Sequence, residues 1–230
     1  MHEIEFSLVP KVNESEEWFP RPYPASKELP EWLRSMPLEV QSPSLTTRTV
    51  KSCVPFVEAL TCGYIIPLAA DIVLHRDKDG FFYGESQDYD IVHMHPANQV
   101  KGAPFESAPI VKILNPWLIR TPPGHSTLFL PPLNRFETPS LPFVPIAGLV
   151  ETDNFYREVN FPAMVTLQPG TRVALPKGTP LVQAIPIKRE DYNSKFGAID
   201  VAKYNEAEQH PGVESLNYYR NHAWVKKVYR

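Results

Sequence analysis

The chain has 230 residues, a formal net charge of -3 and an apolar content of 43%. This length suits a single domain, and the apolar fraction is sufficient for a buried core. The charge is close to neutral and no basic stripe occurs, which argues against a nucleic-acid binder. The sequence also lacks the long apolar run of a membrane-spanning helix.

Two cysteines are too few for a disulfide scaffold, and the first residues lack the basic and apolar stretches of a signal peptide. We therefore expect a cytoplasmic protein with free thiols. Proline is the compositional outlier, with 26 residues against 10 glycines. Because proline fixes φ and removes a backbone donor, this bias disfavours long helices and favours short strands and extended loops.

Residues 1–50 predict an arm and a short helix. Alternating apolar residues over 4–9 favour an opening strand. The segment WFPRPYP, residues 18–24, combines proline with aromatic residues, and we expect it to lie extended across the body with its rings buried. Residues 26–34 predict one or two helical turns, with Pro30 tolerated near the helix start.

Residues 51–190 predict a β core. It opens with a helical turn or two at 53–61, and Gly63 stands where a left-handed C-cap is needed. Strands are predicted at 64–68, 70–74, 81–83 and 90–95, with a hairpin turn at 77–80. Between 115 and 190, Pro or Gly interrupts the apolar runs about every eight to twelve residues, and we expect about six further strands from Ile110 to Ile187.

Residues 191–230 are polar and predict a short helical tail, broken at Pro211–Gly212. No internal repeat occurs. The sequence therefore predicts one domain over residues 1–230, consisting of an arm, a β core and a helical tail.

The whole chain resembles an uncharacterised family of proteins found in tailed phages and some bacteria. The matching pieces are LPEW around Pro30, CVPFVEALTCGYIIPL from Cys53, HPANQ from His95, NPWLIRTPPG from Asn115 and LPKGTPLVQAIPIKRE from Leu175. The resemblance implies a family, and it implies no activity.

The part from Gly148 to Gln183 is similar to trimeric dUTPases and dCTP deaminases, which share a β-clip fold. Residues 148–153, GLVETD, resemble the segment that opens a β-hairpin in those proteins, and residues 177–184, KGTPLVQA, resemble a later strand. Their phosphate-binding arginine-serine-glycine step is replaced here by LPPLN at 130–134. The resemblance implies a β-clip or related β-barrel or sandwich, without the pyrophosphatase activity.

His93 and His95 are the first candidate metal ligands. Residues i and i+2 of a strand face the same side, so both imidazoles are able to converge on one ion. Imidazole pairs suit zinc or iron, and Glu106 and His125 are the available partners. The alternative is a pair of surface or interface histidines at an edge strand.

His75, Asp77 and His125 form an alternative ligand set. A His-x-Asp step with a distal histidine is the facial triad of iron(II) and 2-oxoglutarate oxygenases. Arg135 then stands where such enzymes place a base that binds 2-oxoglutarate. Against this reading, the Asp-Lys-Asp-Gly turn explains Asp77 by itself.

Glu151 and Asp153 are candidate catalytic acids, because two carboxylates on one face of a strand raise the pKa of one of them and create a general base. The alternative is a solvated turn. Cys53 and Trp117 are candidates for a substrate pocket. Cys53 opens a helical turn, where a thiolate is stabilised, whereas a small buried residue and an aromatic core residue are the simpler interpretations.

Two functions follow from these residues. The first is a small-molecule enzyme that uses a non-haem iron or zinc ion to activate oxygen or water. The second is a non-catalytic β-clip binding or assembly protein, acting as a homo-oligomer. The fold alone does not choose between them.

Overall fold

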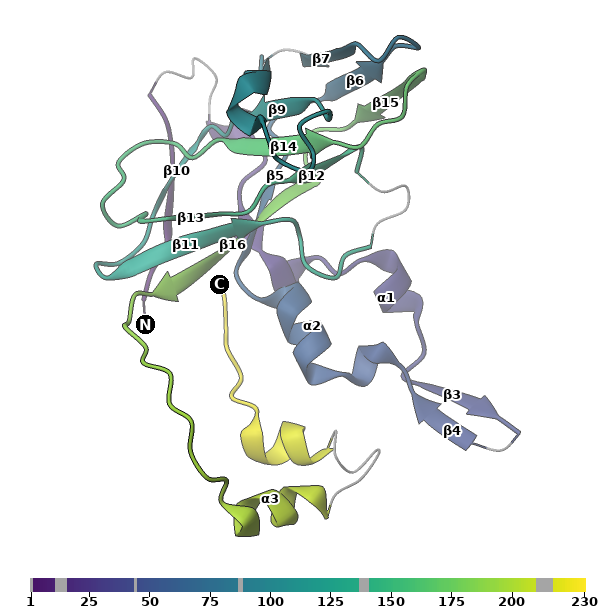
Figure 1. Ribbon diagram of the computed structural model, residues 1–230, viewed down its shortest axis with the longest axis vertical. Helices are drawn as coiled ribbons and strands as arrows, with labels where there is room; N and C mark the ends of the chain where they lie inside the picture. The colour runs from purple at the N-terminus through teal and green to yellow at the C-terminus, as the bar shows by residue number, and fades with distance from the viewer. Residues whose placement is uncertain (1, 11–15, 44, 87–88, 137–140, 210–216) are drawn as a thin grey trace.

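The structure, a computed structural model, describes residues 2–10, 16–43, 45–86, 89–136, 141–209 and 217–230. These residues form a mostly β protein in which all paired strands are antiparallel (Figure 1). The prediction of a mostly β fold is confirmed. Within the described ranges the sheets are open, and they do not close into a barrel.

The largest sheet has five strands, and β16 lies at its centre. Its strand order is β13 (Gly148–Val150), β11 (His125–Leu130), β16 (Pro180–Lys188), β5 (Tyr64–Pro67) and β2 (Tyr23–Pro24). β16 spans nine residues and pairs with β11 along one edge and with β5 along the other. Residues 180–184, for which the sequence predicts a strand, therefore lie in the middle of this sheet.

Two smaller sheets complete the body, and two strand pairs are attached to it. A four-stranded sheet has the order β12 (Phe143–Pro145), β14 (Phe161–Val165), β9 (Ile110–Ile113) and β8 (Val92–Met94). A three-stranded sheet has the order β15 (Thr171–Leu175), β6 (Ile72–Arg76) and β7 (Phe82–Ser86). The pairs are β1 (Glu5–Leu8) with β10 (Trp117–Arg120), and β3 (Glu39–Ser42) with β4 (Leu45–Arg48).

The helices are short, as the proline content predicts. The α-helices are α1 (Glu31–Ser35), α2 (Val54–Thr61) and α3 (Val201–Glu208). The 3-10 turns are η1 (Glu16–Trp18), η2 (Ala25–Lys27), η3 (Val50–Ser52) and η4 (Ala97–Val100), and a π-helical turn, η5, covers Tyr219–Ala223. None of the helices among the described residues is long and apolar enough to cross a membrane.

One continuous core joins the sheets. Phe129 of β11 and Phe161 of β14 meet with ring centroids 5.6 Å apart, which links the five-stranded and four-stranded sheets. Phe19, from the segment before β2, is 3% exposed and belongs to the same core. The ammonium group of Lys177 lies 3.4 Å from the ring centroid of Trp18, so residues 18 and 19 both contact the body.

The local predictions for α2 and the first hairpin are confirmed. α2 ends at Thr61, and Gly63 follows in the left-handed region with a φ of +68°. The amide of Gly80 donates to the carbonyl of Asp77 at the turn between β6 and β7. Two predictions need correction: strands β3 and β4 lie in the region assigned to the arm, and eight strands, rather than six, lie between Ile110 and Lys188.

Gly63 generates the first testable prediction. A Cβ atom at this position lies 2.3 Å from the backbone oxygen of Ala184 in β16, in a conformation that side-chain-bearing residues rarely adopt. We therefore expect Gly63→Ala to lower the free energy of unfolding by about 1–3 kcal/mol, measured by urea denaturation. Gly148→Ala is the control, because its Cβ meets no atom within 4 Å; it changes stability by less than about 0.5 kcal/mol. Equal stabilities of the two variants would contradict this reading of the turn.

Candidate functional site

The predicted metal ligands lie on three different sheets. His75 is on β6, His93 is on β8, His95 directly follows β8, and His125 begins β11. In the part of the chain that the structure describes, no three His, Cys, Asp or Glu side chains form a group able to hold a metal ion. Neither predicted ligand set is therefore assembled, and the observed fold lends no support to an iron or zinc site.

Three of the predicted ligands, His93, Asp77 and His125, have local contacts instead. The Nε2 atom of His93 lies 3.5 Å from a carboxylate oxygen of Asp90. The carboxylate of Asp77 accepts a 2.8 Å hydrogen bond from the amide of Phe81, within the hairpin turn. His125 lies beside His2, with ring centroids 4.8 Å apart.

Arg135 holds the segment around α1 against the body. Its side chain donates a 3.1 Å hydrogen bond to the carbonyl of Glu28, and its own carbonyl accepts one from the indole of Trp32. Arg135 is 4% exposed. These contacts give Arg135 a structural role, while its predicted contact with 2-oxoglutarate stays a prediction.

Trp117 and Cys53, the predicted pocket residues, lie in the core and at the start of α2 respectively. Trp117 is 2% exposed in the core, and its indole donates a 3.3 Å hydrogen bond to the carbonyl of Pro20. Cys53 is the N-cap residue of α2, has a free thiol, and accepts a backbone hydrogen bond from Val57. Their positions favour the simpler interpretations, a core aromatic residue and a helix-capping position.

Asp153 forms a bidentate ion pair with Arg189. The two guanidinium nitrogens donate to the two carboxylate oxygens at 2.8 and 2.5 Å, and the amide of Gly124 donates to the same carboxylate at 2.8 Å. The Asp153 side chain is 6% exposed, whereas its neighbour Glu151 is exposed. We call Gly124, Asp153 and Arg189 the Asp153 clamp.

The clamp determines the charge state of Asp153. The hydrogen bonds from Arg189 lower the pKa of Asp153 from 3.8 to about 2, with a further contribution from Gly124, and they outweigh the opposing effect of desolvation. A carboxylate with so low a pKa is a poor general base at neutral pH. The arrangement therefore favours a structural role for Asp153 over the predicted catalytic one.

A buried group of threonine hydroxyls supports the clamp. The hydroxyls of Thr121 and Thr127 each lie 2.7 Å from the hydroxyl of Thr152, and Thr121 also donates to the carbonyl of His125. All three threonines are buried. They connect the turn before β11, the strand itself and the loop after β13. No motif in the sequence marked this group.

The segment that follows the clamp leaves the body. Every residue from 187 to 209 is exposed, and residues 189–200 contain no helix or strand. Figure 1 shows this segment running away from β16 to α3, well separated from the sheets. We call residues 189–209 the C-terminal strap. Its exposed apolar side chains are Tyr192 (83%), Phe196 (99%), Ile199 (63%), Val201 (59%) and Tyr204 (51%).

Residues 217–230 return to the body, and we call them the C-terminal anchor. Three of their contacts are to residues at or just before α2: the ammonium group of Lys227 lies 2.6 Å from the carboxylate of Glu58, Arg220 donates to the carbonyl of Ser52, and Arg48 donates to Asn217. Further along, the rings of Tyr229 and Tyr64 meet edge to face at 5.9 Å. The clamp therefore holds the first residue of the strap, and the chain contacts the body again at the anchor; residues 210–216 between them lie outside the described residues.

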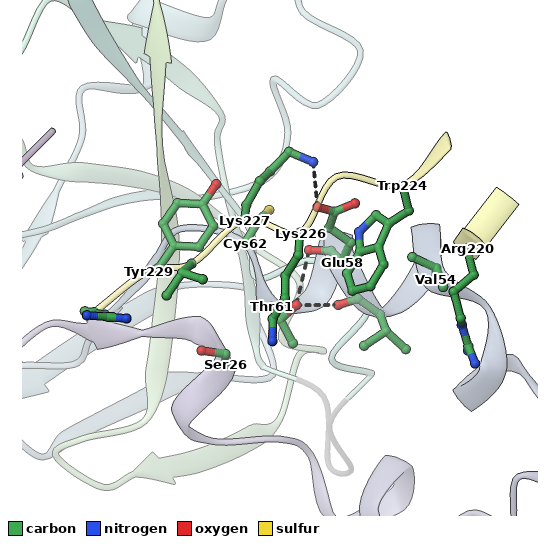
Figure 2. Close-up of a pocket in the computed structure, with 13 residues that line it drawn as sticks. Ser26, Val54, Glu58, Thr61, Cys62, Arg220, Trp224, Lys226, Lys227 and Tyr229 are labelled. Carbon is green, nitrogen blue, oxygen red and sulfur yellow. Dashed lines mark hydrogen bonds and ion pairs between the residues drawn. The ribbon is translucent and has the colours of Figure 1, made fainter. Parts of the chain in front are cut away.

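A cleft of about 610 Å³ lies between α2 and the C-terminal anchor (Figure 2).

No family model, curated protein or solved structure matches this chain. The resemblances to the phage and bacterial family and to the β-clip proteins therefore stay predictions.

The clamp yields a prediction about pH. Because the pKa of Asp153 in the folded protein lies below its ordinary value of 3.8, the clamp stabilises the fold above pH 3.8 and loses this contribution as the pH falls toward about 2. We expect Asp153→Asn to lower the urea midpoint at neutral pH, and the difference from the wild type to shrink across this pH window. Glu85→Gln, which alters an exposed carboxylate on β7, is the control. A difference that is independent of pH would contradict the assignment.

Proposed function

We propose that this protein is a non-catalytic binding or assembly protein that associates with further copies of itself through the C-terminal strap. The observation that carries this proposal is the exposure of five large apolar side chains on a segment that lies between two contacts with the body, at Arg189 and at the anchor. Phe196, with 99% of its surface exposed, is the extreme case.

Burial of the exposed apolar side chains away from water favours binding of the strap. Full burial of one large apolar side chain contributes about 1.5–3 kcal/mol relative to its exposed state. Contiguous exposed apolar surface on a soluble protein marks an interaction site. The strap exposes aromatic and aliphatic groups along one continuous segment, so a partner that covers them gains several such contributions at once.

Unlike a free chain end, the strap lies between two parts of the chain that contact the body, Arg189 and the anchor. β16 is fixed at the centre of its sheet and leads directly into the clamp at Arg189. Tyr64 of β5 contacts the far end of the anchor through Tyr229 and Arg230. A segment restrained at both ends loses less conformational entropy when it binds than a free chain end loses.

The body of the same chain offers a surface of matching chemistry. An apolar groove of about 540 Å³ is lined by prolines and by Phe136, Phe143, Val144 and Leu175. Phe136 is 69% exposed and Val144 is 42% exposed. A strap from a second copy fits this groove by apolar complementarity, and repetition of one contact around a symmetry axis produces a closed oligomer.

The test compares native masses. By size-exclusion chromatography with light scattering across a dilution series, we expect the wild type to show a mass that is a multiple of 26.2 kDa at high concentration. The double variant Phe196→Ser with Ile199→Ser removes two exposed strap side chains and is expected to shift to the mass of one chain. The matched control is Phe81→Ser with Tyr83→Ser, which removes exposed aromatic residues at the β6–β7 hairpin and leaves the mass unchanged.

A wild type with the mass of one chain at every concentration contradicts self-association. Metal analysis distinguishes the assembly protein from the metal-dependent enzyme. Stoichiometric metal in the purified wild type, lost in His125→Ala, supports the metal-dependent enzyme and not the assembly protein.

A further inference from the structure

The cleft between α2 and the C-terminal anchor has the size of a small-molecule site. Its volume of about 610 Å³ falls within the range of about 300–1,000 Å³ that such sites occupy. Figure 2 shows α2 contributing Val54, Glu58 and Thr61, while the anchor contributes Trp224 and Tyr229. The cleft thus lies where two segments far apart in the sequence come together.

The walls of the cleft are largely apolar. Val54 and Val57 line it from α2, and Trp224, Val228 and Tyr229 line it from the anchor. The indole N–H of Trp224 is buried and has no hydrogen-bond partner among the described residues. An aromatic or aliphatic group packs well against such walls, because both sides of the cleft present carbon surfaces.

The charged residues of the lining are predominantly basic. Four of them are cations, Arg220, Lys226, Lys227 and Arg230, and Glu58 is the acid in this set. Lys227 and Glu58 neutralise each other at 2.6 Å. Outside this pair, Arg220 and Lys226 add positive charge to the lining, which favours a ligand that carries negative charge.

The thiol of Cys62, just after α2, and the hydroxyl of Tyr229 in the anchor favour ligand binding over a covalent reaction. Desolvation by burial raises the pKa of the Cys62 thiol and also that of the Tyr229 hydroxyl. A nucleophilic cysteine needs a lowered pKa. Both groups stay protonated at neutral pH, so the cleft presents no activated nucleophile.

We propose that this cleft binds a small organic anion that has an aromatic or aliphatic body and one anionic group. The body lies between Val57 of α2 and Trp224 of the anchor. The anionic group is paired with Lys226, which is exposed at the cleft and makes no ion pair with the described residues. This binding does not depend on the strap and goes beyond the proposed assembly function.

The position of the cleft also has a consequence for stability. A ligand that contacts α2 and the anchor together binds only the folded arrangement, so it stabilises the attachment of the anchor by mass action.

The probe for the test is 8-anilinonaphthalene-1-sulfonate, which combines an aromatic body with a sulfonate. We expect its fluorescence to rise on titration into the full-length protein, and Lys226→Glu to weaken its affinity by about tenfold, since one charge contact of about 1.4 kcal/mol corresponds to that factor. Lys101→Glu, at an exposed lysine outside the cleft, is the matched control and leaves the affinity unchanged.

Two further arms locate the dye. We expect energy transfer from tryptophan to the bound dye to fall in Trp224→Phe. We also expect N-phenyl-1-naphthylamine, which lacks the sulfonate, to bind more weakly than the anionic dye. Val57→Asp places a carboxylate on the apolar wall and abolishes binding while far-UV circular dichroism stays that of the wild type. The proposal is overturned if no dye binds, or if affinity is the same in the wild type, Lys226→Glu and Val57→Asp. None of these variants alters the strap, so failure here is distinct from failure of self-association.

Discussion

Gln183 lies at the middle of β16 with no exposed surface, and its side-chain amide hydrogen bonds to three backbone groups. The amide nitrogen donates to the carbonyls of Ala59 and Cys62, and the amide oxygen accepts from the backbone N–H of Leu133. An unsatisfied buried polar group costs about 1–3 kcal/mol, so these partners are strongly specified. One side chain therefore fixes the end of α2 and the loop after β11 relative to the central strand.

The surface features depend on this placement. Because α2 is held against β16, its outer face is available to the C-terminal anchor, and the cleft forms between them. The same strand leads directly into Arg189, whose ion pair with Asp153 determines where the strap leaves the body. Asp153, which the sequence suggested as a catalytic acid, forms this ion pair at the point where the strap begins.

Local structure was predictable from the sequence, and long-range pairing was not. The C-cap at Gly63 and the turn at Asp77 follow from conformational preferences of a few neighbouring residues, and both are observed. Asp153 and Arg189 are 36 residues apart, and Glu58 and Lys227 are 169 apart. Their pairing depends on which strands are neighbours, which the spacing of apolar residues does not reveal. Among the described residues the predicted histidine ligands do not come together for a related reason: a same-face pair on one strand needs further ligands from other strands, and the other candidates lie on other sheets.

Amide hydrogen exchange of residues 190–208 tests whether the strap is an interaction surface between copies of this chain. Peptides from this segment are compared at low and high protein concentration by mass spectrometry. We expect the strap to exchange rapidly in the dilute protein and more slowly at high concentration. The exchange of α2 is expected to be the same at both concentrations. Rapid exchange of the strap at every concentration would contradict self-association through the strap.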